Sequence, residues 1–113
     1  MPTFLPRDED FHPIPALRLK PGGAHAVPVG DSSARNAVAF AADTRVIAVH
    51  SDVPAFLRSG DAAVSASASD HFLPAGVYLY LSVGDNRQSV RHTHLAALAA
   101  DSAPGTLHVS EME

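Results

Sequence analysis

The clearest candidate metal ligands in this sequence are the histidines of the run His92-Thr93-His94. Residues i and i+2 of a β-strand point to the same side, so both imidazoles can reach one ion. His108, on a strand that could be a hairpin neighbour, would supply a third ligand. However, no carboxylate stands at a spacing typical of a metal motif, and paired histidines on exposed strands are commonly just solvated. We therefore predict no bound metal, with this histidine set as the open alternative.

Asp70 and His71 follow a serine-rich stretch, 65–69, which raises the question of a hydrolytic triad. The nucleophile of many hydrolases stands in a Gly-x-Ser-x-Gly turn between a strand and a helix. This sequence contains no such turn and no helix to follow it, and serine-rich loops are ordinary. A triad is not expected.

Paired carboxylates for glycoside chemistry are equally poorly supported. The three glutamates are Glu9, Glu111 and Glu113, all near the ends of the sequence, where a desolvated pocket is not expected. Gly22-Gly23 follows no phosphate-binding pattern and opens no helix. The sequence therefore predicts a protein that is not an enzyme and that holds no cofactor.

Tyr78 and Tyr80 place two rings on one face of an expected strand. The simplest interpretation is packing against a cross-strand neighbour. A protein interface is the functional interpretation, because tyrosine supplies a large contact area at low entropic cost. A platform on which a sugar stacks is the third. We assign Tyr78 and Tyr80 to an interface between subunits.

The strands that would carry these residues are short runs of alternating apolar residues, broken about every ten residues by Gly, Pro, Asp or Ser. Such a pattern is typical of an all-β sandwich or a small barrel. We expect an antiparallel, jelly-roll-like β-sandwich over residues 14–113. The expected strands are 14–19, 25–29, 33–40, 44–50, 54–58, 77–83, 93–98 and 106–110.

Two of these segments have more specific expectations. Residues 44–50 are nearly all apolar and rich in β-branched side chains, which predicts burial on both faces. In residues 77–83, Val77, Leu79, Leu81 and Val83 are expected to face the core, opposite the two tyrosines. Residues 20–23 are expected to form a turn, and the Ala/Ser-rich residues 62–69 a small-residue strand or a loop.

Composition predicts a modest core. The chain has 113 residues, of which 46% are hydrophobic, but alanine dominates that fraction and tryptophan is absent. Burying one Leu, Val or Phe contributes roughly 1.5–3 kcal/mol, against about 1–2 kcal/mol per residue for ordering the backbone. A core of this kind is marginal alone, so we expect a homo-oligomer.

Charge and targeting signals exclude several partners. The formal net charge is −4, with a single lysine and scattered arginines, so no basic cluster is available for nucleic acid. The lack of cysteine fits assembly in a reducing cytoplasm. No secretory signal or membrane-spanning stretch is visible, so we expect a soluble protein without a membrane partner.

The first thirteen residues differ from the rest. Prolines bias residues 1–13 to extended conformations, and Asp8-Glu9-Asp10 is an acidic run. The apolar residues of this segment, Phe4, Leu5 and Phe11, have no local partner. A frayed tail is the ordinary interpretation. We favour an extended arm whose apolar side chains contact a larger partner.

Four stretches of the chain resemble a known family. They begin at Arg45 (RVIAV), Asp52 (DVPAFL), Ser69 (SDHFLPAGV) and Gly105 (GTLHVSEM). The third and fourth resemble the (S)D-x-(Y/F)-L-P-A-G-V and G-T-L-(Y/H)-V-(S/T)-E motifs of small virion proteins from tailed-phage and alphaproteobacterial gene-transfer-agent clusters. The resemblance covers roughly residues 33–112.

Within that family, the alanine-rich chain with its proline-rich arm is most similar to the base of gene-transfer-agent head spikes. The resemblance implies a structural β-sandwich that is attached to a capsid protein and holds a receptor-binding spike or fibre protein. It implies assembly in the bacterial cytoplasm and localisation in a phage-like particle. A carbohydrate-binding module for a cell-surface polysaccharide, with Tyr78, Tyr80 and the His92/His94 face as platform, is the alternative function.

Overall fold

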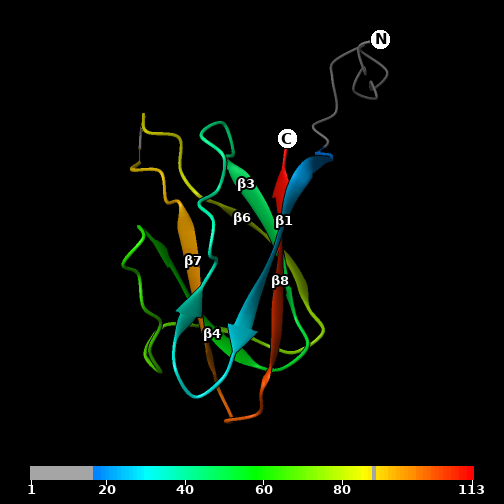
Figure 1. Ribbon diagram of the computed structural model, residues 1–113, viewed down its shortest axis with the longest axis vertical. Coiled ribbons are helices and arrows are strands. Elements are labelled where there is room, and N and C mark those ends of the chain that lie inside the picture. The colour runs from blue at the N-terminus through cyan, green and yellow to red at the C-terminus, as the bar shows by residue number, and fades with distance from the viewer. Residues whose placement is uncertain (1–16, 88) are drawn as a thin grey trace, which may run out of the picture.

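The protein is a sandwich of two antiparallel four-stranded sheets, which confirms the predicted fold class (Figure 1). The computed structural model describes residues 17–87 and 89–113, and no helix occurs among them. The strand orders β1-β8-β3-β6 and β2-β7-β4-β5 are those of a jelly roll. The strands of the first sheet are β1 (Leu19–Val29), β8 (Gly105–Met112), β3 (Val46–Ser51) and β6 (Tyr78–Ser82). Those of the second are β2 (Ala34–Arg35), β7 (His94–Ala99), β4 (Ala55–Gly60) and β5 (His71–Leu73).

The core lies between the two sheets. It is built from alternate residues along each strand, whose side chains point inward. In β3, Ile47, Ala48 and Val49 are at most 1% exposed. Ile47 and Val49 face the core, whereas Val46, Ala48 and His50 face outward on the side of the sheet that no described segment covers. The expectation that residues 44–50 are buried on both faces is therefore wrong in extent, because Arg45 is exposed and Val46 and His50 are partly exposed.

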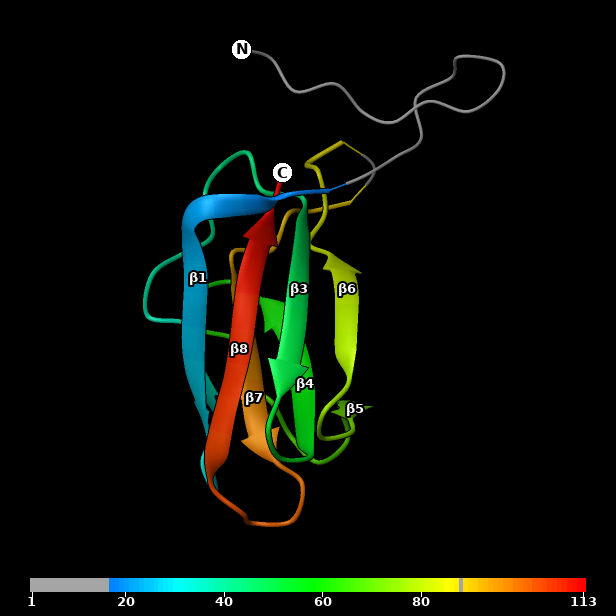
Figure 2. The same ribbon diagram turned by 90° about the vertical axis from the view of Figure 1, so that its right-hand side faces the viewer.

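The expected turn at residues 20–23 is wrong. One strand, β1, runs through these residues, while 14–16 of the expected first strand lie outside the described residues. Leu19 pairs with Met112 and Ala24 with Ser110, so four residues of β1 stand opposite one of β8. Gly22 has a φ of 75°, which lets the backbone bend and then continue in the sheet. Figure 2 shows the resulting sharp bend near the start of β1.

The expected strand 33–40 is also wrong in extent, because β2 ends after Arg35. The side chain of Asn36 replaces the ladder at that point. Its Oδ1 accepts a hydrogen bond from the Leu95 N–H at 2.8 Å, and its Nδ2 donates to the carbonyls of Val38 at 2.7 Å and Thr93 at 3.3 Å. The asparagine is 2% exposed. One side chain thus holds the 36–40 segment to the start of β7 without strand geometry.

The Ala/Ser-rich segment 62–69 is a loop, one of the two structures expected for it. Val64 and Ala66 pack on Ala96 and Leu98, on the outer face of the second sheet. The following residues include the three-residue strand β5, which was not among the expected strands. The second sheet is therefore partly covered on its outer face, whereas no described segment covers the outer face of the first.

Candidate interaction surface

Four rings form a continuous row across the outer face of the first sheet. His108 of β8 pairs with His50 of β3, which pairs with Tyr78 of β6. The ring centroids of His108 and His50 lie 6.3 Å apart, and those of His50 and Tyr78 lie 6.2 Å apart. Tyr80 continues the row, with its centroid 5.8 Å from that of Tyr78. Side chains on one face of paired strands are close neighbours, so the row follows from the register.

Most of the other side chains on this outer face are small, and none of them carries a formal charge. We define the ring face as the outward residues of the four paired strands from Ala24 onward. In addition to the rings it contains Ala24, Ala26, Pro28, Val46, Ala48, Ser82, Thr106, Ser110 and Met112. None of these is Lys, Arg, Asp or Glu. Tyr78 and Tyr80 are 54% and 58% exposed, so two large rings stand above a low, uncharged surface.

The register confirms that Tyr78 and Tyr80 lie on one face, opposite Leu79 and Leu81. Of the histidines that extend this face, His50 was not predicted as part of any site, and His108 was considered only as a third metal ligand. Their outward positions follow from strand alternation, but their pairing across 58 residues depends on the sheet topology. The other residues assigned to an interface, Phe4, Leu5 and Phe11, lie outside the described residues.

The three histidines considered as metal ligands lie apart. His92 precedes β7 and its Nδ1 lies 2.7 Å from Ser59 Oγ, while His94 is 8% exposed with its Nδ1 2.7 Å from Thr93 Oγ1. His108 belongs to the other sheet and points outward from it. No group of three potential metal ligands occurs among residues 17–87 and 89–113.

Asp70 and His71 lie in different surroundings, the first closing a loop and the second lining a groove. The Asp70 carboxylate closes the preceding loop by accepting the Ser67 N–H at 2.7 Å, and it lies 3.9 Å from Arg58. His71 begins β5 and lines the opening between the sheets. The serines of this loop bond within the loop, as in the Ser67–Ser69 pair at 2.9 Å. The arrangement is that of a stabilised turn.

Glu111 is buried, contrary to the expectation for a glutamate near the end of the sequence. Only 4% of it is exposed. One carboxylate oxygen accepts hydrogen bonds from the Thr44 hydroxyl and, at 2.7 Å, from the Ala41 N–H. The other lies 2.7 Å from His25 Nε2. The inward positions of Leu107 and Val109 on the same strand were a signal for this burial, because residue i+2 shares their face.

The environment of Glu111 favours its ionised form. Burial acts to raise the pKa of this carboxyl, but the hydrogen bonds from Thr44, His25 and the Ala41 backbone outweigh it and hold the pKa below its usual value of 4.5. The group joins β1, β8 and the 41–44 segment on the inner side of the sandwich. Its role is structural, since hydrogen bonds and packing engage both oxygens.

Acid should therefore weaken the fold through Glu111. A carboxyl whose pKa is lower in the folded than in the unfolded chain adds stability above the unfolded value, and this contribution is lost as the pH falls through the folded value. We expect the unfolding free energy of the natural chain to fall below pH 4.5 more steeply than that of Glu111→Gln. Urea unfolding across an acid series measures both slopes, and parallel slopes would contradict this role for the carboxylate.

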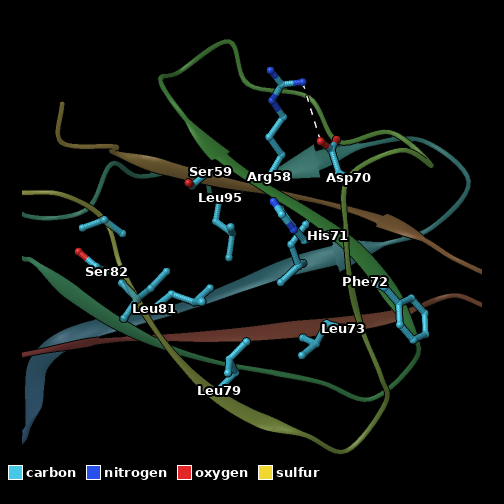
Figure 3. Close-up of a pocket in the computed structure, with 13 residues that line it drawn as sticks. Arg58, Ser59, Asp70, His71, Phe72, Leu73, Leu79, Leu81, Ser82 and Leu95 are labelled. Carbon is cyan, nitrogen blue, oxygen red and sulfur yellow. Dashed lines mark ion pairs between the residues drawn. The ribbon is translucent and has the colours of Figure 1, made fainter. Parts of the chain in front are cut away.

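A groove lies at the edge of the sandwich formed by β5 and β6, where the two sheets do not close over the core (Figure 3). The groove, of about 490 Å³, separates β5 from β6. Its floor and walls are apolar, whereas polar side chains stand at its rim. The apolar residues are Ile47, Leu57, Phe72, Leu73, Leu79, Leu81, Val83 and Leu95, and the polar ones are Arg58, Ser59, Asp70, His71 and Ser82.

The groove explains a departure from the expected burial of residues 77–83. Leu79 and Leu81 face inward as predicted, and Val83 is 2% exposed. Yet Leu79 is 41% exposed and Val77 is 40% exposed. The reason is that β5 has only three residues, so nothing in the described chain covers the inner side of β6 along its full length.

Comparisons with known proteins return no relative. No family model matches the chain, and neither a curated protein nor a solved structure matches it. Among the described residues, no helix has the length and apolarity that crossing a bilayer requires.

Proposed function

We propose that this protein is a structural subunit that assembles through the ring face, packed against the same face of a second copy. The observation that carries the proposal is the row of four rings on a charge-free sheet face. Interfaces are enriched in tyrosine and depleted in charged residues at their centre. Two sheets stack face to face at about 10 Å when their facing residues are small, with larger side chains interdigitating.

The assembly we propose is a phage-like particle of the gene-transfer-agent type. In it the protein forms the base of a head spike or fibre, attached to the capsid protein and holding a receptor-binding fibre. Two observations support this. The sequence motifs that begin at Ser69 and Gly105 resemble those of small virion proteins. The jelly-roll strand order is also common in capsid and lectin domains, an analogy at the level of fold only.

The exposure of two neighbouring tyrosines also favours a second candidate, a carbohydrate-binding module. A sugar stacks best on flat rings that share a plane. Tyr78 and Tyr80, however, are inclined at 64° to one another. The subunit interface is favoured because edge-to-face rings interdigitate with side chains of an opposing protein surface.

We expect a charge among the rings of the ring face to separate the subunits. Tyr80→Lys should weaken self-association at least about tenfold, because a large aromatic buried in an interface commonly contributes about 2 kcal/mol or more. Phe72→Lys is the matched control, since Phe72 is 56% exposed on the opposite sheet against 58% for Tyr80. Light scattering over a concentration series measures the effect. A natural chain that is monomeric throughout the series would refute the assembly.

The particle assignment has its own test. The protein should co-sediment with the capsid protein encoded in its own gene cluster. Comparing Tyr80→Lys, which should separate the subunits, with Phe72→Lys, its control, shows whether co-sedimentation depends on the contact between subunits. Binding to a glycan array that is lost in Tyr80→Ala, without capsid binding, would support the carbohydrate module in its place.

A further inference from the structure

The groove between β5 and β6 is an unfinished part of the core. Both strands are the last of their sheets, and neither has a further partner among the described residues. The inward side chains of β6 are apolar but remain open to solvent, with Leu79 41% exposed. Exposed aliphatic surface that is continuous with a core gains free energy when another apolar group covers it.

The shape of the opening fits an extended peptide. The free edge of β6 presents backbone N–H and C=O groups along Tyr78–Ser82, and such an edge accepts an added strand. The groove is about 490 Å³, within the range of roughly 300–1,000 Å³ typical of sites that bury a ligand. Alternate side chains of an added strand would point between Leu79, Leu81 and Leu73.

The chain's own N-terminal segment has the required chemistry. Its large apolar side chains are Phe4, Leu5, Phe11 and Ile14, and its prolines favour extended backbone. Its acidic run, Asp8-Glu9-Asp10, complements the groove's rim, where Arg58 has a side chain 61% exposed and is 3.9 Å from its nearest carboxylate.

The segment also begins at the right place. Arg18 and Glu113 exchange backbone hydrogen bonds of 2.9 Å, and Leu19 pairs with Met112. Figure 2 shows this part of the chain crossing the ends of β8 and β3 toward β6. Met112 pairs with Val46, and Val46 with Ser82, so Leu19 and the groove end of β6 stand at one end of the sheet.

The distance can be covered within one molecule. Three strand spacings separate Leu19 from Ser82, which is about 14 Å. Phe11 precedes Leu17 by six residues, a reach of about 20 Å when extended. Phe11 and Ile14 can therefore enter the groove of their own chain.

We propose that residues 3–14 of the same chain fill the groove between β5 and β6 and pair with the free edge of β6. This goes beyond the proposed function and does not rest on it. The segment would complete the core, with Phe11 and Ile14 as its apolar plug and the acidic run facing Arg58. The ring face stays free for its own partner, because it lies on the outer side of the first sheet.

A single introduced tryptophan tests the proposal, since the chain has none. In Phe11→Trp we expect blue-shifted emission and severalfold weaker acrylamide quenching than in the same variant unfolded in urea. Adding Leu79→Asp in the groove should restore the exposed-indole signal. Adding Val38→Asp, at a 68% exposed position that does not line the groove, should leave emission unchanged. Circular dichroism verifies that each variant is folded.

The outcomes are distinct. Emission and quenching of an exposed indole in the folded Phe11→Trp chain would overturn the proposal, as would equal effects of the two aspartates. A blue shift that appears only as protein concentration rises would overturn the same-chain assignment in favour of a neighbour's segment. A blue shift that persists in monomeric Tyr80→Lys would support the groove even if the proposed assembly failed.

Discussion

Replacing Glu111 by alanine should lower the free energy of unfolding by about 3–5 kcal/mol, the usual cost of removing one partner from a buried ionic cluster. The change leaves the Thr44 hydroxyl, the Ala41 N–H and His25 Nε2 without their acceptor in a site that is only 4% exposed. It also leaves a cavity where the carboxylate stood, since alanine keeps only the Cβ of the side chain. For a domain with a stability of about 5–15 kcal/mol, this is a large part of the total.

Glu113→Ala provides the matched control two residues away. Glu113 forms a 3.1 Å ion pair with Arg18, whose side chain is 67% exposed, so its removal should cost at most about 1 kcal/mol. Chemical denaturation measures both variants. A loss below about 1 kcal/mol for Glu111→Ala would mean that the cluster is not structural. In that case the buried carboxylate would need a different explanation.

The features that the sequence could predict are those fixed by local alternation. The inward leucines and outward tyrosines of β6 and the burial of Ile47 and Val49 in β3 follow from side-chain period and composition. The all-β class follows from regular turn signals between short apolar runs. None of these inferences requires knowing which strands become neighbours.

The features that it could not predict depend on long-range pairing. His50 and His108 join the ring face only because β3 and β8, far apart in sequence, are adjacent in the sheet. Residues 20–23 have the composition of a turn, yet β8 offers a continuous partner on both sides of them, so the strand bends and continues. The groove is likewise invisible locally, because it arises from the shortness of β5 opposite β6.

The ring face and the groove are separate surfaces of the proposed subunit, and we propose a different occupant for each. In the two proposals, the charge-free outer face packs against another copy and the open edge of the sandwich takes up residues 3–14. Both contacts would bury apolar surface that a small core leaves exposed. The modest core expected from composition would then be stabilised at two separate places, and the variants Tyr80→Lys and Leu79→Asp test them one at a time.

Replacing Asn36 should have the second-largest effect on the fold. Asn36→Ala is expected to cost about 2–4 kcal/mol, because the Leu95 N–H and the carbonyls of Val38 and Thr93 lose their partner in a site that is 2% exposed. Asn36→Asp has nearly the same shape but turns the donating nitrogen into a second acceptor. It should therefore be at least as destabilising at neutral pH, since it places a buried carboxylate against two carbonyl oxygens.

This comparison separates hydrogen bonding from packing. If Asn36 only filled space, Asn36→Ala would lower stability without speeding hydrogen exchange of the Leu95 N–H. If it replaces the strand ladder, Asn36→Ala should also speed that exchange, because the Leu95 N–H loses Asn36 Oδ1, its acceptor at 2.8 Å, whereas Asn36→Asp keeps an oxygen acceptor there. Ala37→Ser, at the exposed neighbouring position, should leave both stability and exchange close to those of the natural chain. A normal Leu95 exchange rate in Asn36→Ala would show that the end of β2 is fixed by other contacts.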